Sequence, residues 1–256
     1  MCSSDLKITI AGAVVTTLAG QAAAWGTADG TGTAASFQGP MGLTPYGGFL
    51  YVSDTDNYTI RKVDIATAAV TTIAGEAGTD GSADSIPPRF NYPFDVASDG
   101  ENLYVCDTQN HTIRKAVIAT GVVTTLAGLA ETPGSVDGLG SAARFIYPSG
   151  IATDGTNLYV ADYDNHAIRK ILISNGDVTT VAGLLGTFGS ADGGAAARFN
   201  NPWGIVLDGT NLYVADSGNS TIRKIDTSTG DTTTIAGSAG ETGSADGIGA
   251  DRKSVV

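Results

Sequence analysis

The sequence has few of the residues that most often build active sites, metal sites and cross-links. It contains two histidines and two cysteines, and only 16% of its residues are charged. His111 and His166 provide too few strong ligands for a usual zinc site, and no Ser-His-Asp constellation can be assembled around them. The sequence contains a repeat, described below, and at the position of Cys106 its other copies have Ser or Ala. We therefore expect Cys106 to be a small buried strand residue, and no disulfide is predicted. We expect neither a metal nor a cofactor.

Long apolar runs and clustered cations are also missing. No stretch is long and apolar enough for a transmembrane helix, so membrane insertion is not expected. Eight of the 14 basic residues stand in four Arg-Lys pairs and three more each precede a Phe, which leaves no basic patch. With a net charge of −12 and a pI near 4.3, the chain is a poor candidate for binding nucleic acid through its phosphates.

One phrase of sequence recurs four times. It runs from Tyr-Val-x-Asp through Ile-Arg-Lys to Thr-Thr-x-Ala-Gly, and its tyrosines are 53, 55 and 54 residues apart (Tyr51, Tyr104, Tyr159 and Tyr213). Self-similarity at such a period indicates one supersecondary unit that buries its faces only against its neighbours.

Each period contains four short strand-like runs and no helical spacing. In the last full copy these runs are 203–207, 211–215, 221–226 and 231–236, separated by Asp-Gly, Ser-Gly-Asn and Thr-Gly-Asp turns. Four consecutive antiparallel strands in every period form a β-propeller blade, whereas a β-solenoid would need a shorter coil without hairpin turns. The sequence therefore predicts an all-β propeller.

The period as a whole resembles a known repeat. Pro-x-Gly-Ile-x-x-Asp-Gly-x-Asn-Leu-Tyr-Val-Ala-Asp-x-x-Asn-x-x-Ile-Arg-Lys-Ile is similar to the NHL repeat, and the first copy departs from it most, at 41–48. The resemblance implies a closed propeller, commonly of six blades. We expect four full four-stranded blades here, with partial blades at both ends, as an incomplete arc of such a ring.

The repeat also sets the expected domain organisation. The full blades should cover 21–75, 76–128, 129–183 and 184–237, after the outer strands of a truncated blade in 7–20 and before the first loop of another in 238–250. Residues 1–6 and 251–256 match no repeat position and read as translated sequencing adapter. We expect both to be non-native ends of a fragment of a longer protein.

Three residues recur at fixed positions in every copy, and we assign them to the architecture. We expect the Asp to cap the turn after the second strand, the Asn to tolerate a positive φ there, and the Arg to pair with turn carboxylates. A ring of metal-binding or acid–base carboxylates is the alternative. The residues are Asp54, Asp107, Asp162 and Asp216; Asn57, Asn110, Asn165 and Asn219; and Arg61, Arg114, Arg169 and Arg223.

A long Gly-rich loop precedes each first strand. It contains neither a phosphate-binding nor a calcium-binding motif. We expect its recurring Phe to pack between blades, at Phe37, Phe90, Phe145 and Phe199.

The positions that vary between copies are the candidates for ligand binding. In an antiparallel meander, the turn after the second strand lies at the same end as the loop to the next blade, so both share one rim. Aromatic residues with a polar tip are good anchors there, although a merely solvated rim is the alternative. The candidates are Tyr58, His111, Tyr163, His166, Asp56 and Asp164.

These observations favour a non-enzymatic binding or scaffold propeller for a protein or carbohydrate ligand, outside or on the surface of a bacterial cell. The alternative is a propeller enzyme, a lyase or lactone-type hydrolase, with catalytic residues partly in missing blades. Such enzymes depend on His, Glu or Asp from first strands, and here those strands offer Asp95 and no histidine.

Overall fold

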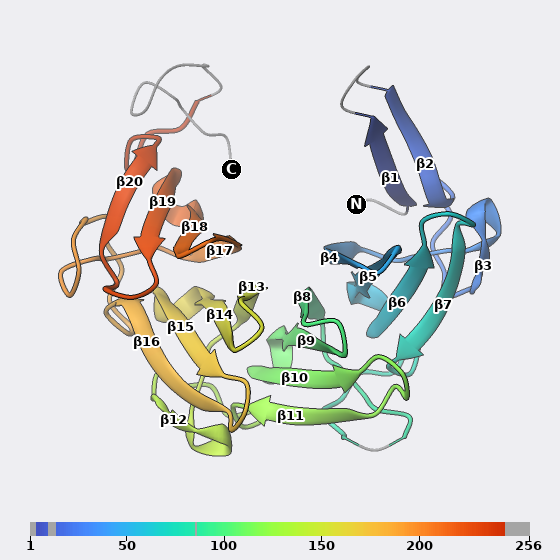
Figure 1. Ribbon diagram of the computed structural model, residues 1–256, viewed down its shortest axis with the longest axis horizontal. Helices are drawn as coiled ribbons and strands as arrows, with labels where there is room; N and C mark the ends of the chain where they lie inside the picture. The colour runs from blue at the N-terminus through green and yellow to red at the C-terminus, as the bar shows by residue number, and fades with distance from the viewer. Residues whose placement is uncertain (1–3, 10–13, 85, 244–256) are drawn as a thin grey trace. The chain divides into compact units, whose positions relative to one another are not determined.

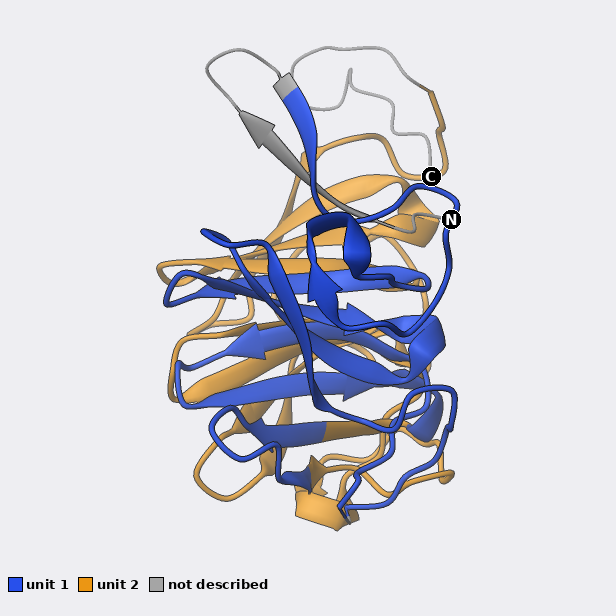
Figure 2. Cartoon of the chain, turned by 90° about the vertical axis from the view of Figure 1, so that its right-hand side faces the viewer, with its two compact units in different colours: residues 1–110, 114–125 blue, residues 111–113, 126–256 orange. Residues whose placement is uncertain are grey.

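The computed structural model of the protein describes residues 4–9, 14–84 and 86–243. For residues 4–9 and for residue 14 it describes the backbone alone. The predicted non-native end 251–256 and the loop segment 244–250 lie outside the described residues, as do 1–3. The chain divides into two compact units, residues 1–110 with 114–125, and residues 111–113 with 126–256 (Figure 2).

The described chain consists of strands joined by turns, including short 3-10 turns, so the predicted all-β class is confirmed (Figure 1). Four sheets are antiparallel meanders with the strands in chain order, and we call them blades 1 to 4. Blade 1 consists of β4 (Pro40–Tyr46), β5 (Phe49–Asp54), β6 (Thr59–Asp64) and β7 (Ala69–Ala74), and blade 2 of β8 (Pro93–Ser98), β9 (Asn102–Asp107), β10 (Thr112–Val117) and β11 (Val123–Ala127). Blade 3 consists of β13 (Pro148–Thr153), β14 (Asn157–Asp162), β15 (Ala167–Leu172) and β16 (Asp177–Gly183), and blade 4 of β17 (Pro202–Asp208), β18 (Asn211–Asp216), β19 (Thr221–Asp226) and β20 (Thr232–Ala236). The prediction of four propeller blades is confirmed.

Three short additions accompany the blades. The strands β1 (Ser4–Thr9) and β2 (Val14–Gly20) form a two-stranded sheet. The Gly-rich loops add a fifth strand to two blades, β3 (Gly30–Thr31) beside β7 and β12 (Gly138–Leu139) beside β16. These extra strands were not predicted, because a two-residue pairing leaves no periodicity in the sequence.

Each first strand begins with a proline opposite the aspartate that ends the second strand. In blade 3, Pro148 pairs with Asp162, and the register shifts before Ile151 pairs with Val160. Because proline has no N–H to donate, it is tolerated at the first residue of a strand or at a bulge. The same shift occurs in the other three blades. It brings the long loop down onto the end of the second strand.

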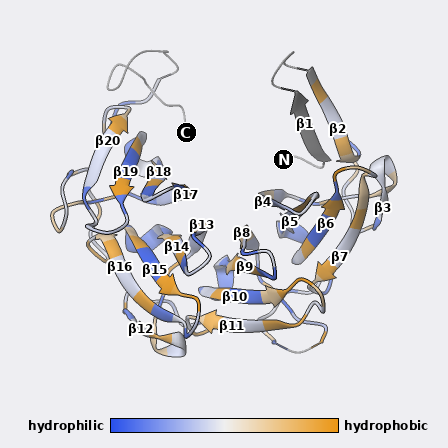
Figure 3. Cartoon of the chain, viewed as in Figure 1, coloured by the Kyte–Doolittle hydropathy of each residue, from blue (hydrophilic) through white to orange (hydrophobic). Residues whose placement is uncertain are grey.

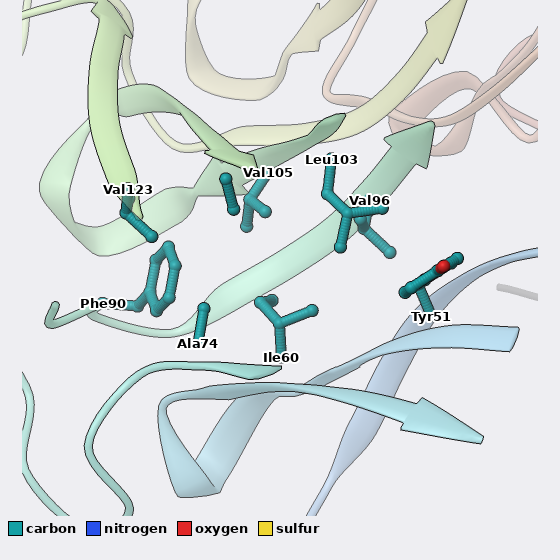
Figure 4. Packing of buried hydrophobic residues seen from close by; sticks show 9 residues of the cluster. Tyr51, Ile60, Ala74, Phe90, Val96, Leu103, Val105 and Val123 are labelled. Atoms are coloured by element: carbon teal, nitrogen blue, oxygen red, sulfur yellow. The ribbon is translucent and has the colours of Figure 1, made fainter. Parts of the chain in front are cut away.

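Each unit has its own apolar core between adjacent blades. In the first unit, Ile60 of blade 1 packs with Phe90 of the loop and with Leu103 of blade 2 (Figure 4). In the second unit, Ile168 and Phe199 pack in the same way with blade 4. All four loop phenylalanines are fully buried, and these two have the predicted position between blades. Burying a side chain of this size stabilises the fold by about 1.5–3 kcal/mol.

The third strands combine apolar and charged residues. Figure 3 shows hydrophilic and hydrophobic stretches on the same strands, β6, β10 and β15 among them. The hydrophilic stretch is the Arg-Lys pair, and the arginine in it is fully buried in every blade. A buried guanidinium is tolerated only when it is paired and hydrogen-bonded, so its partners decide how the blade is built.

Candidate functional site

The buried arginines each bind the aspartate that ends the second strand. In blade 3, Arg169 Nη1 lies 2.6 Å from Asp162 Oδ2, and both side chains are fully buried. The guanidinium carbon lies 5.0 Å from the centre of the Phe145 ring, where cation–π attraction adds to the pairing. Equivalent pairs at 2.6–2.7 Å occur in the other three blades, so the predicted pairing of arginine with turn carboxylates is present throughout.

The aspartate holds the long loop and does not cap its own turn. Asp162 Oδ1 accepts the backbone N–H of Ile146 in the loop at 2.8 Å, and Oδ2 accepts Asn165 Nδ2 at 2.8 Å. The 3-10 turn η5 (Tyr163–Asn165) has no side-chain cap, and the same holds for η2 (Thr55–Asn57) and η6 (Ser217–Asn219). The predicted capping role is therefore wrong.

The asparagine also differs from its predicted role. Asn165 donates its second Nδ2 hydrogen bond to the carbonyl of Gly134, at 2.8 Å, which fastens the start of the Gly-rich loop. The positive φ belongs to the following residue, with values of 54–59° at Tyr58, His111, His166 and Ser220. A planar amide is needed to bridge the carboxylate and the carbonyl, and this explains why Asn recurs while its successor varies.

A second carboxylate completes the arginine's environment, and sequence reasoning missed it. Arg169 Nη2 lies 2.7 Å from Asp137 in the Gly-rich loop, which also accepts the backbone N–H of Thr180 in β16 at 3.1 Å. The corresponding carboxylates in the other blades have side chains that are 44–48% exposed (Asp29, Asp84 and Asp192). The signal was the phrase Gly-x-Ala/Val-Asp, repeated at 26–29, 81–84, 134–137 and 189–192.

Burial determines the electrostatics of these clusters. It raises the pKa of Asp107 and of Asp162 to about 6, against the opposing effect of the arginine, the asparagine and the backbone N–H. The pKa values of Asp54 and Asp216 are raised for the same main reason. The buried carboxylates remain ionised at neutral pH, and each is paired with the arginine of its blade. These residues hold loop to blade and offer a ligand little surface.

The six predicted binding residues lie on the turn after the second strand, beside the loop that leads into the next blade. We call this surface the loop rim of each unit; in the first unit it comprises the turns η2 and η3 (Thr108–Asn110), and in the second the turns η5 and η6, each with its Gly-rich loops. Within each unit the turn is hydrogen-bonded to the loop before its own blade, as Asp56 N is to Gln38 O, and to the loop that leads into the next blade, as Gly78 N is to Asn57 O and Gly186 N to Asn165 O. The assignment of the six residues to ligand binding stays a prediction.

The residues with positive φ pack against the residue that precedes the next blade's proline. The rings of Tyr58 and Tyr92 meet edge to face at 5.4 Å, and those of His111 and Tyr147 at 4.7 Å. His111 is only 7% exposed, and its Nδ1 accepts the N–H of Tyr147 at 3.2 Å. His166 Nδ1 accepts the N–H of Asn201 at 3.1 Å. Burial lowers the pKa of both histidines, so they are neutral at pH 7.

Four residues at the junction of blades 3 and 4 form a distinct group, which we call the aromatic corner: Tyr163, Asp164, Asn201 and Trp203. The rings of Tyr163 and Trp203 lie 5.4 Å apart at 78°, and Trp203 is 43% exposed. Asp164 Oδ1 accepts Asn201 Nδ2 at 2.8 Å. Beside the corner, the ring of Phe188 is 5.8 Å from that of His166 and is 69% exposed. Phe188 was not singled out from the sequence.

Blade 4 has a second exposed feature, on its flat face. A hollow of about 300 Å³ is lined by seven residues, among them Val206, Tyr213 and Ile222. Ile222 is 38% exposed, whereas its counterparts Ile60 and Ile168 are fully buried under the next blade's core. Within the described residues this apolar face has no cover.

The described residues contain neither a candidate metal cluster nor a candidate membrane-spanning helix. No group of three or more His, Cys, Asp or Glu side chains in this part of the chain is placed to hold a metal ion. No helix among the described residues is long and apolar enough to cross a membrane.

The match to a known protein family falls on the repeats that form blades 3 and 4. The NHL repeat family matches residues 145–171 and 199–225, which run from the loop phenylalanine to the third strand in blades 3 and 4. The chain belongs to the NHL-repeat family. It is 29% identical to human NHL repeat-containing protein 2 over 83% of its own length, and 30% identical to the protein SUPPRESSOR OF QUENCHING 1, chloroplastic, of Arabidopsis thaliana over 86%. It spans only 34% and 22% of these relatives.

Solved structures show the same fold. An auxiliary nutrient binding protein from Bacteroides thetaiotaomicron has a TM-score of 0.62 and 24% identity, over 83% of this NHL-repeat chain and 50% of that one. Virginiamycin B lyase from Staphylococcus aureus has a TM-score of 0.55 and 18% identity, over 90% of this chain and 61% of that one. At these identities the likeness concerns the fold, which in these two proteins accompanies binding and catalysis respectively.

Proposed function

We propose that the loop rim of this NHL-repeat propeller binds a protein or carbohydrate ligand and that the chain has no catalytic role. The NHL propeller fold supports a binding or scaffolding function. The observation that carries the choice of the rim is the contrast within each blade. Arginine, aspartate and asparagine are buried and bound to one another, while the positions between them vary. Of the varying positions, Asp56, Tyr58, Tyr163, Asp164 and His166 are partly exposed, whereas Thr55, His111 and Ser220 are buried. Because the hydrogen bonds and ion pairs of the recurring Arg, Asp and Asn hold the blade together, the varying positions are available to bind a ligand.

The enzyme alternative has less support. Among the described first strands, β4, β8, β13 and β17 carry no histidine, and their carboxylates are Asp95 and the strand-end Asp208. In this part of the chain, neither carboxylate belongs to a group of three or more His, Cys, Asp or Glu side chains that could hold a metal ion. The cellular location belongs to the same proposal: a binding propeller of this acidity is expected outside or on the surface of a bacterial cell.

The proposal is tested with defined probes on the chain as it stands. We expect at least one member of a panel of neutral oligosaccharides and synthetic peptides to bind. The rim variants Tyr58→Ser and Tyr163→Ser each alter the rim of one unit, and the one in the unit that binds the ligand should weaken binding by about tenfold. The control variant carries Glu101→Gln and Thr156→Ala, in the hairpin turns at the other end of the strands. Loss of binding in the control, with both rim variants binding normally and staying folded, would reject the rim.

A further inference from the structure

We infer that the aromatic corner binds a cation, the Lys or Arg side chain of a basic segment in a protein partner. The inference rests on the proposed function and names the ligand class for one part of the loop rim. The corner is Tyr163, Asp164, Asn201 and Trp203, all within the second compact unit.

The two rings form walls at nearly a right angle. Their planes are 78° apart and their centres 5.4 Å apart, which fixes each ring by an edge-to-face contact. Trp203 is nonetheless 43% exposed, so part of its indole remains open to solvent. An aromatic face carries negative potential, and tryptophan attracts ammonium and guanidinium groups more strongly than tyrosine or phenylalanine. A preset pair of walls binds such a group at little entropic cost.

The negative charge of the Asp164 carboxylate also suits the aromatic corner to binding a cation. Asp164 follows Tyr163 directly, and in the described part of the chain no Lys or Arg lies within ion-pair distance of its carboxylate. The nearby His166 is neutral at pH 7, because burial lowers its pKa. The chain as a whole carries a net charge of −12, which steers cationic partners toward it and repels phosphate groups.

The architecture does not require these residues. At the position of Tyr163 the other blades have Thr55, Thr108 and Ser217, and at the position of Trp203 they have Met41, Phe94 and Ser149. The first of these positions follows the same Asp in each blade, and the second follows the proline of the first strand. Only the junction of blades 3 and 4 combines Tyr, Asp, Asn and Trp. A large exposed aromatic that the fold does not need is the informative kind of surface residue.

Phe188 extends the corner with an apolar surface. It is 69% exposed and anchored by its contact with His166. Lys and Arg side chains bury their methylene stems on apolar surface while the charged head reaches an acceptor. A basic peptide therefore fits this region better than a single small cation, because stem and charge both find a complement.

The test is a peptide titration with neutralised controls. Short peptides containing lysine or arginine are titrated into the Trp25→Phe variant, which leaves Trp203 as the single tryptophan and as the fluorescent reporter. We expect saturable quenching or enhancement that weakens by about tenfold when lysine is acetylated or arginine is replaced by citrulline. Binding should also weaken with added salt, since Asp164 supplies part of the attraction.

Variants of the chain locate the effect. Trp203→Ala and Asp164→Asn should each weaken binding of the basic peptide by about tenfold, monitored by calorimetry in the otherwise unaltered chain. Asp177→Asn removes the same charge from an exposed residue at the start of β16 and should leave affinity unchanged. Melting curves for each variant separate lost binding from lost folding.

Three results would overturn the inference. The first is that no basic peptide binds at concentrations up to millimolar. The second is that acetylation of the peptide lysine leaves the affinity unchanged. The third is that the Trp203→Ala and Asp164→Asn variants bind the peptide with the affinity of the parent. If a neutral oligosaccharide binds instead and loses affinity in the same two variants, the loop rim stands as the binding surface and the cation is rejected. If the peptide binds normally to these two variants but not to the hairpin-turn control variant, both the cation and the rim are rejected.

Discussion

Replacing Asp162 with Ala should destabilise the protein by about 3 kcal/mol, because it removes the centre of a buried ionic cluster. Asp162 is fully buried, and its two oxygens accept three hydrogen bonds, from Ile146 N, Asn165 Nδ2 and Arg169 Nη1. Breaking a buried ion pair by deleting one partner costs about 3–5 kcal/mol, and each buried donor left without an acceptor about 1–3 kcal/mol. Arg169 keeps its second partner, Asp137, so the lower end of the range applies.

The size of this loss distinguishes a turn-capping role of Asp162 from a role as the anchor of the loop. Removing a turn-capping side chain lowers the unfolding free energy by about 1 kcal/mol, which is the loss expected from the sequence pattern alone. Removing a buried carboxylate that accepts hydrogen bonds from three donors should lower it by about three times as much. Chemical denaturation measures the difference, with Asp177→Ala as an exposed control at the start of β16. A double-mutant cycle with Arg169→Met then isolates the pair.

Amide hydrogen exchange provides a local readout of the same change. The amide of Ile146 donates to Asp162 Oδ1, so its protection should fall in the variant by more than that of amides elsewhere in β14 and β15. An unfolding free energy within about 1 kcal/mol of the parent, with Ile146 still protected, would refute the assignment of Asp162 as the anchor of the loop.

Three further predictions follow from the packing. Because Ile222 lies on the uncovered apolar face of blade 4, Ile222→Asp should change the unfolding free energy by less than about 1 kcal/mol, and it should reduce the self-association that we expect this face to cause in sedimentation. The same change at the buried Ile168 should cost more than about 4 kcal/mol. Equal effects of the two changes would contradict the assignment of an uncovered face. Phe199→Ala should cost about 3–5 kcal/mol in denaturant unfolding, and a loss under 1 kcal/mol would argue against its position between blades. His166 accepts the N–H of Asn201 when neutral, and burial holds its pKa below the ordinary value of 6.5. The unfolded state therefore takes up a proton first as the pH falls, so the melting temperature of the parent should drop relative to His166→Gln below about pH 6.5, and a pH-independent difference would contradict this.

The sequence by itself determined the repeat, the four strands of each blade, the turns between them and the burial of the loop phenylalanine. These depend on local restrictions: alternation along a strand, Gly and Asp in tight turns, and a proline that opens the first strand. The pairing of Arg with Asp was also predictable, since the two residues lie only seven positions apart, in adjacent strands of one hairpin. The interpretation as an NHL-repeat propeller needed no tertiary information.

What each anchor touches was decided only by the tertiary structure. Asp162 binds a backbone amide 16 residues earlier, Asn165 a carbonyl 31 residues earlier and Arg169 a loop carboxylate 32 residues earlier. Contacts at such separations leave no mark in local periodicity, so the sequence could show that these residues recur without showing what they hold. The aromatic corner depends on the same long-range closure. Tyr163 and Trp203 come together because the equivalent cluster of blade 4 holds the loop between them: Asp216 accepts the N–H of Asn200, and Asn219 donates to the carbonyl of Gly189. Backbone propensity contains no information about where such a loop returns.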